Sequence, residues 1–245
     1  LNRYFLPNQE NPEGKFIKYN YEAGNPNSLS NDYVWYIHED SKDRIWICTV
    51  EGLCRINRER NLITRINPVV EDGRAYKINP RCIEEFPDNV YWIATDGQGL
   101  FRFDEISGQF KHYSTQNGLP ADNLYSVFHG KEKNLWISSM KGIIRFEPEK
   151  GQTELFTKND GLQDNEFVAG AFHRGQYSNK LYMGGNKGLN AFDPTKISPS
   201  DFKPDIVFTD FYLNNTPVKV GQVITNYIVL PKALNFLDQI TLPHQ

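Results

Sequence analysis

The chain has 245 residues, which is enough for one large all-β domain or two smaller domains. Its 27 Lys and Arg residues are nearly balanced by 30 Asp and Glu residues, without a basic block, so we expect no nucleic-acid partner. No apolar run approaches the roughly 18–20 residues that cross a bilayer, so we expect no direct membrane insertion by this chain.

Two short strand signals open the chain, LNRYF at residues 1–5 and KFIKY at residues 15–19. They match the last two strands of a four-strand unit that follows them. We therefore predict that residues 1–20 form the C-terminal half of a preceding blade. We also expect the natural protein to be longer than this chain or to self-associate, because an uncapped repeat exposes apolar surface and strand edges.

The first complete unit contains four strand signals, here named strands A to D. They read YVWYIHE, RIWICT, GLCRIN and LITRI, between residues 33 and 66. A turn segment, EDSKDR, separates A from B, and Gly52 supplies the positive φ that a tight B–C turn needs. Strand B is apolar on both faces, whereas a half-covered strand alternates. We therefore expect protein on both sides of its sheet.

The unit recurs with a period near 45 residues, as its anchor aromatic residues and glycines show. The anchors lie 46, 44 and 46 residues apart, and a glycine follows each by six or seven residues. The anchors are Trp46, Trp92, Trp136 and Tyr182, and the glycines are Gly52, Gly99, Gly142 and Gly188. This period, with four short strands per unit, is typical of propeller blades.

We therefore predict an all-β fold with four β-propeller repeats over residues 21–203, as part of a larger propeller. The three tryptophan anchors are expected in its core. Strands A to C are expected at residues 32–57, 78–104, 122–147 and 165–193. The fourth unit shows no clear strand D, and the short insertion HRGQYSNK interrupts its spacing.

The pattern changes after Asp193. The segment PTKISPSDFKPD holds three prolines and two serines, which is typical of a domain boundary. We predict a hairpin around Asn214 and Asn215, followed by further strands. Residues 204–245 are too few for a stable sandwich, so we interpret them as the truncated start of an immunoglobulin-like β-sandwich.

The units resemble the two-component regulator propeller repeat. The segment SLSNDYVWYIHEDSKDRIWICTVEGLCRIN matches it almost position by position, and NPNSLSND, NGLPADN and DGLQDNE are similar to its D–A loops. The segment KPDIVFTDFYLNNTPVKVG resembles the opening of the Tyr-rich immunoglobulin-like domain that follows such propellers. The second unit departs from the pattern, because VVEDGRAYKINPRCIEE lacks the Ser/Gly-Leu lead-in.

The resemblance implies the extracytoplasmic sensor region of a membrane-bound histidine kinase, often a hybrid one, so a periplasmic location is expected. The kinase and the membrane span of such proteins are not in this chain, and signalling output is therefore not expected of the chain alone. Because kinases of this family work as dimers, the resemblance also implies self-association.

The sequence shows no catalytic, cofactor or metal constellation above chance. The three cysteines lack CxxC spacing, and the five histidines lack the spacing of metal ligands. The DGQGLF segment around Gly97 lies on a B–C hairpin with no helix after it, which argues against a phosphate loop. We expect free buried thiols at Cys48, Cys54 and Cys82, no cofactor, no metal and no enzymatic activity.

The architecture indicates where a ligand would bind. The D–A and B–C loops of a propeller meet at one end of its central channel, where pockets form. Amides, carboxylates and aromatic faces there suit a sugar, whose hydroxyls need hydrogen bonds and whose apolar face needs stacking. The candidate residues are Asn31, Asp32, Tyr33, Trp35, Arg81, Asp122, Asn123, Tyr125, Asn165 and Glu166. Alternatively, the Asn and Asp side chains satisfy turn backbone and the aromatic rings pack between blades.

Three functional hypotheses follow. The first is a non-catalytic sensor module that recognises an extracellular oligosaccharide or relays its binding to a kinase. The second is a propeller-fold lyase or hydrolase, which a cluster of His, Arg and carboxylate groups converging in the channel with perturbed pKa values would favour. The third is an architectural dimerisation module, which a large apolar, self-complementary interface would favour.

Overall fold

The structure is a computed structural model that describes residues 1–8, 12–57, 62–130, 133–197, 208–224 and 226–242. The chain divides into two compact units, residues 1–197 and residues 198–245. The described residues form strands with a few short 3₁₀ turns, so the predicted all-β fold is confirmed. Across these ranges, no helix combines the length and the apolar character that a membrane crossing needs.

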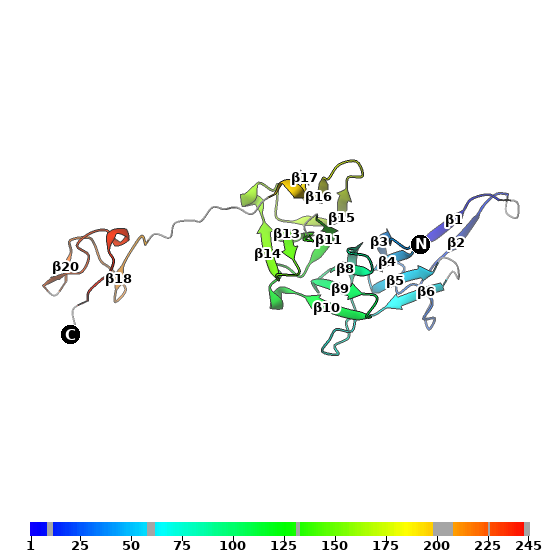
Figure 1. The fold of residues 1–245 in the computed structure, drawn as a ribbon, viewed down its shortest axis with the longest axis horizontal. Coiled ribbons are helices and arrows are strands. Elements are labelled where there is room, and N and C mark those ends of the chain that lie inside the picture. Colours follow the sequence, from blue (N-terminus) through cyan, green and yellow to red (C-terminus); the bar gives the residue numbers. More distant parts are fainter. Residues whose placement is uncertain (9–11, 58–61, 131–132, 198–207, 225, 243–245) are drawn as a thin grey trace. The chain divides into compact units, whose positions relative to one another are not determined.

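The first unit consists of antiparallel sheets that correspond to propeller blades (Figure 1). The N-terminal half-blade pairs β1 (Asn2–Phe5) with β2 (Lys15–Lys18). Blade 1 contains β3 (Val34–Glu39), β4 (Ile45–Thr49), β5 (Gly52–Asn57) and β6 (Leu62–Ile66). Blade 2 contains β7 (Pro80–Glu85), β8 (Val90–Thr95), β9 (Leu100–Asp104) and β10 (Gln109–Tyr113).

Two further blades complete this unit. Blade 3 contains β11 (Leu124–His129), β12 (Leu135–Ser139), β13 (Gly142–Glu147) and β14 (Gln152–Phe156). Blade 4 contains β15 (Phe167–Arg174), β16 (Leu181–Gly185) and β17 (Gly188–Phe192). Within the described residues the sheet of blade 4 has three strands and no strand D, as the sequence indicated. The A strands of neighbouring blades, β3 with β7, β7 with β11 and β11 with β15, are in contact.

Glycine at the B–C turn is required for two reasons, which Gly142 illustrates. Its φ is +142°, in the region that residues with a Cβ rarely adopt. A Cβ built on Gly142 would lie 2.1 Å from the backbone oxygen of Phe156, the last residue of strand D. In blades 2 and 3 the repeated glycine therefore sets the turn and lets strand D approach it closely.

The anchor tryptophans are buried between blades, as predicted. Trp46, Trp92 and Trp136 are no more than 4% exposed. Each packs against a phenylalanine near the end of strand C of the next blade. The ring-centroid distances are 6.4 Å for Trp46–Phe103, 6.3 Å for Trp92–Phe146 and 5.1 Å for Trp136–Phe192. The sequence period is thus the period of the contacts that hold the blades together.

A buried polar network adds to the contact between blades 1 and 2. The Asp40 side chain is fully buried, and its Oδ2 accepts hydrogen bonds from Trp46 Nε1 (2.8 Å), Tyr91 Oη (3.0 Å) and Arg44 Nε (2.8 Å). Arg44 also forms an ion pair with Glu105, the residue that follows strand C of blade 2. Every member has a partner, which is the condition under which a buried polar network specifies one packing arrangement.

The second unit is small and is described separately. Its hairpins pair β18 (Tyr212–Leu213) with β19 (Thr216–Pro217) and β20 (Val223–Ile224) with β21 (Tyr227–Ile228). Asn214 and Asn215 have positive φ values of 50° and 62°, as a two-residue hairpin turn requires, so the predicted hairpin is present. Val218, Val229 and Leu230 form a buried cluster. The assignment of residues 1–20, 21–203 and 204–245 to separate domains stays a prediction.

Removal of an anchor ring should weaken the blade stack. We expect Trp92→Ala to lower the free energy of unfolding by about 3–5 kcal/mol, because it leaves a cavity between blades 2 and 3. Urea unfolding followed by circular dichroism measures the change. Trp35→Ala, which removes an exposed ring, is the matched control and should have a much smaller effect. Equal losses in the two variants would contradict the inter-blade role of Trp92.

The buried Asp40 network predicts a specific acid sensitivity. Burial alone raises the pKa of Asp40, but hydrogen bonds from Trp46, Arg44 and Tyr91 outweigh it and lower the pKa from 3.8 to about 2. A depressed folded-state pKa contributes stability that is present above the unfolded value and is lost as the pH falls through the folded value. Between pH 5 and pH 3 this contribution should fall by about 1 kcal/mol.

The variant Asp40→Asn tests that sensitivity, because asparagine keeps an acceptor oxygen but does not titrate in this range. Its unfolding free energy should change less between pH 5 and pH 3 than that of the unmodified chain. Asp43→Asn, in the same turn but exposed, controls for the lost charge. Parallel pH profiles for the unmodified chain and Asp40→Asn would show that Asp40 is not responsible.

Candidate functional site

The candidate site lies where the A strands begin, and β-bulges place its central side chains. The pairing of strand A with strand B shifts register at Trp35 in β3, at Arg81 in β7 and at Tyr125 in β11. These residues occupy equivalent positions in blades 1, 2 and 3. A bulge leaves one residue outside the regular ladder and redirects its side chain. The same local irregularity therefore presents three different side chains at one end of the propeller.

Arg81 is the centre of the contacts in this group. Its guanidinium carbon lies 3.9 Å from the centroid of the Trp35 ring, in a cation–π arrangement. Its Nη2 donates to Asp96 Oδ2 in an ion pair, while Asp96 Oδ1 accepts a 2.9 Å hydrogen bond from Asn123 Nδ2. The contacts therefore connect strand A of blade 1, strand A and the B–C turn of blade 2, and the D–A loop of blade 3.

Tyr125 lies beside the ion pair, and its phenol stays protonated. Burial and the negative charge of Asp96 raise the pKa of Tyr125, and Glu166 of blade 4 acts in the same direction. The Glu166 carboxylate also accepts a 3.0 Å hydrogen bond from Asn186 Nδ2. We name the six side chains the Trp35 cluster: Trp35, Arg81, Asp96, Asn123, Tyr125 and Glu166.

The other predicted site residues either accept hydrogen bonds from loop backbone or are exposed. Asn31 Oδ1 accepts from the Tyr33 backbone N–H, Asp32 Oδ1 from Tyr21, and Asn165 Oδ1 from Lys158, at 2.7–2.8 Å. The Asp122 carboxylate accepts from the backbone N–H and hydroxyl of Thr115. The Tyr33 side chain is exposed. For these five residues the structure shows turn stabilisation or exposure and no contact with the Trp35 cluster.

Asp96 was absent from the residues named on the sequence alone. It occupies the first position of the B–C turn of blade 2, where blades 1, 3 and 4 carry Val50, Met140 and Asn186. It is therefore the acidic residue of an otherwise uncharged set. That single departure from the repeat could have indicated Asp96 as a site residue, because B–C turns lie at the same end of a propeller as D–A loops.

The Trp35 cluster offers binding groups rather than an activated nucleophile. Arg81 and Tyr125 donate hydrogen bonds, Asp96 and Glu166 accept them, and Trp35 presents a partly exposed aromatic face. In the part of the chain that the structure describes, no group of three His, Cys, Asp or Glu side chains is placed to hold a metal ion. The three cysteines are free and buried.

Comparison with solved structures bears on the fold. Among solved structures, the chain resembles the extracellular domain of BT4673, a proposed hybrid two component system from B. thetaiotaomicron. The TM-score is 0.64 and the sequence identity is 20%, and the match covers 75% of this chain and 25% of that one. The extracellular domain of BT3049, a second such proposed system from B. thetaiotaomicron, is also similar, with a TM-score of 0.61 and 19% sequence identity. The match covers 90% of this chain and 32% of that one. These likenesses show a propeller fold of the kind found in such domains.

The sequence comparisons bear on the repeat and on one relative. Residues 28–51 match the two component regulator propeller model, so the predicted repeat is confirmed in the lead-in and strands A and B of blade 1. The chain is 26% identical over 217 residues to histidine kinase P4 of Formosa agariphila, covering 85% of this chain. It spans only 16% of that relative's length.

The exposure of Trp35 can be measured without a ligand. Of the four tryptophans, Trp35 is 44% exposed and the other three are buried, so acrylamide should quench one emitting class readily and the remainder weakly. Trp35→Phe should abolish the readily quenched class, and Arg81→Ala should make Trp35 more accessible, because the guanidinium no longer covers its ring. A quenching curve unchanged by Trp35→Phe would contradict this geometry.

Proposed function

We propose that this chain is the ligand-recognition part of the extracytoplasmic, periplasmic sensor region of a membrane-bound two-component histidine kinase. In this proposal it binds an oligosaccharide at the Trp35 cluster and catalyses no reaction. The observation that carries the proposal is the convergence of an aromatic face, a guanidinium, a phenol and two carboxylates from four successive blades. Localisation is supported by the extracellular domains among the similar structures.

The chemistry of the Trp35 cluster supports a polyhydroxyl ligand. A pyranose ring needs paired donors and acceptors for neighbouring hydroxyls, and Arg81 beside Asp96 supplies both within one ion pair. The apolar face of the ring needs an aromatic plane, which the exposed part of Trp35 provides. Tyr125 adds a hydroxyl that stays protonated, because burial raises its pKa.

The position of the Trp35 cluster on several blades also supports a relay, in which ligand binding changes how the blades are arranged. The residues of the Trp35 cluster lie on, or directly before, the A strands of four blades or in the turns beside them, and these strands contact one another. A ligand that contacts several blades would stabilise one arrangement of them over another. Because the chain spans a small part of its kinase relative, the step from this arrangement to a signal belongs to the whole protein. Self-association as a dimer stays a prediction.

Thermal unfolding of the chain against a panel of neutral oligosaccharides tests the proposal. A ligand that binds the folded state alone adds about 2.7 kcal/mol at 100 times its dissociation constant, enough for a shift of several degrees. One sugar class should give a saturable shift. Trp35→Ala and Asp96→Asn should each reduce it strongly, because they remove the stacking face and the negative charge that pairs with Arg81.

Tyr33→Ala is the matched control, because Tyr33 is an exposed aromatic residue two positions away that does not contact the Trp35 cluster. It should leave the ligand-induced shift unchanged. Absence of a shift with any sugar, from a chain that still unfolds cooperatively, would contradict sugar binding by these blades. A shift that persists in Trp35→Ala would place binding elsewhere.

A further inference from the structure

A second group of functional side chains lies at the opposite end of the A strands, where they finish. Here a pocket of about 650 Å³ is formed by the ends of β7, β11 and β15 and by the insertion that follows β15. Its lining includes Phe86, His129, Arg174, Gln176, Tyr177 and Asn179. We name it the Arg174 pocket. Its volume is in the range that small-ligand sites occupy.

The base of the Arg174 pocket is fixed by contacts between three blades. Glu84 Oε1 accepts from His129 Nδ1 at 2.7 Å and from Arg174 Nη2 at 3.1 Å. The same Nη2 donates to the His129 backbone oxygen at 2.7 Å. The Phe86 ring stacks on the imidazole with centroids 4.4 Å apart and planes 6° apart. The imidazole is therefore held by a hydrogen bond at one edge and by a ring on one face.

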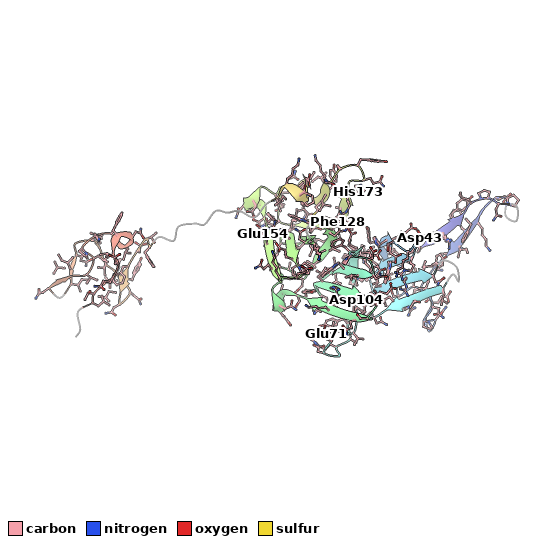
Figure 2. All side chains as sticks on the ribbon, viewed as in Figure 1. Asp43, Glu71, Asp104, Phe128, Glu154 and His173 are labelled. Carbon is pink, nitrogen blue, oxygen red and sulfur yellow. The ribbon has the colours of Figure 1, made fainter. Side chains whose placement is uncertain are left out.

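Arg174 also contacts an aromatic ring, that of Phe128. Its guanidinium carbon lies 5.3 Å from the centroid of the Phe128 ring. Figure 2 labels Phe128 on strand A of blade 3 and His173, the residue before Arg174, on strand A of blade 4. Contacts with Glu84, the His129 backbone and Phe128 leave the guanidinium little freedom. Such a preorganised cation loses little entropy when a ligand binds.

These contacts leave specific atoms available to a ligand. Among the described residues, the hydrogen bonds of Arg174 all come from Nη2, so the N–H groups of Nε and Nη1 remain as donors. With Nδ1 directed at Glu84, Nε2 is the imidazole nitrogen left to accept a hydrogen bond. Among the described residues that line the Arg174 pocket there is no Asp or Glu, and Arg174 is the one Arg or Lys.

We propose that the Arg174 pocket binds an acidic sugar, a ring that carries both hydroxyls and a carboxylate. The carboxylate pairs with the free donors of Arg174, because charge-assisted hydrogen bonds are the strongest available here. A ring hydroxyl donates to His129 Nε2, and the amides of Gln176 and Asn179 serve the remaining hydroxyls. Tyr177, which is fully exposed, supplies an aromatic plane at the rim.

The cluster of Glu84, His129 and Arg174 contains the His, Arg and carboxylate groups that would favour an enzyme. Its geometry fits binding better. Glu84 uses one oxygen for both partners, so the carboxylate is engaged with the guanidinium as well as with the imidazole. The Arg174 pocket is also separate from the Trp35 cluster, so the two proposals stand or fall independently.

The test uses galacturonate as the probe, with galactose as its neutral counterpart and inorganic sulfate as a plain anion. Calorimetric titration should show saturable galacturonate binding, at least tenfold tighter than galactose and tighter than sulfate. Galacturonate should also shift the ring signals of His129 in NMR spectra, assigned by their loss in His129→Gln. Galactose that binds as tightly as galacturonate, or sulfate that binds as tightly, would overturn the acidic-sugar proposal.

Two variants of residues that line the Arg174 pocket, together with two controls, separate a loss of ligand binding from a loss of stability. Arg174→Gln should lower galacturonate affinity at least tenfold, whereas Arg102→Gln, which removes an arginine on β9, should not. Tyr177→Ala should weaken binding without affecting the fold, because the Tyr177 side chain is fully exposed. Trp35→Ala should leave galacturonate binding unchanged. Binding that survives both Arg174→Gln and Tyr177→Ala, or that is lost in Trp35→Ala, would falsify the assignment to this pocket.

Discussion

The contact between the anchor tryptophan of one blade and the strand C phenylalanine of the next is the constraint on which the remaining structure depends. A single blade has apolar residues on both faces and cannot bury them alone. Trp92 against Phe146 buries one face of blade 2 and one face of blade 3 together. Each such aromatic pair contributes about 0.5–1.5 kcal/mol beyond its buried area. Because the contact repeats, it sets the same spacing between every pair of blades and brings their A strands together.

The close approach of the A strands makes both candidate binding regions possible. Their first residues meet at the Trp35 cluster, and their last residues meet at the Arg174 pocket. Between these ends, Tyr36 of blade 1 contacts Phe172 of blade 4, with ring centroids 5.3 Å apart. Burial raises the pKa of Tyr36, so its hydroxyl stays neutral in this packed middle layer. The same strands thus carry polar groups at both ends of an apolar centre.

The regular part of the fold was predictable because its causes lie within one repeat. The spacing of Trp46, Trp92 and Trp136, with a glycine after each, gave the strands and the buried core, and the structure confirms both. Asn31 and Asp32 stay predicted ligand contacts, and in the structure their side-chain oxygens accept hydrogen bonds from the backbone N–H groups of Tyr33 and Tyr21. The convergence of Glu84, His129 and Arg174 depends on three blades at once. These three residues lie one repeat period apart, at 45 and 45 residues, but the side chains at these strand ends differ from blade to blade, so the period alone does not indicate their chemistry.

The positions that break the repeat therefore carry most of the chemistry. The anchor tryptophans of blades 1 to 3 are the same residue type, and each meets a strand C phenylalanine of the next blade. Arg81, Asp96 and the insertion after Arg174 lie away from that contact, since bulges and loops place them outside the stacked faces. Arg81 occupies a position where blades 1 and 3 have an aromatic residue, and it pairs with Asp96, the first residue of the B–C turn of blade 2. In this propeller the repeated residues build the blade stack, and the residues that differ between blades determine what it can bind.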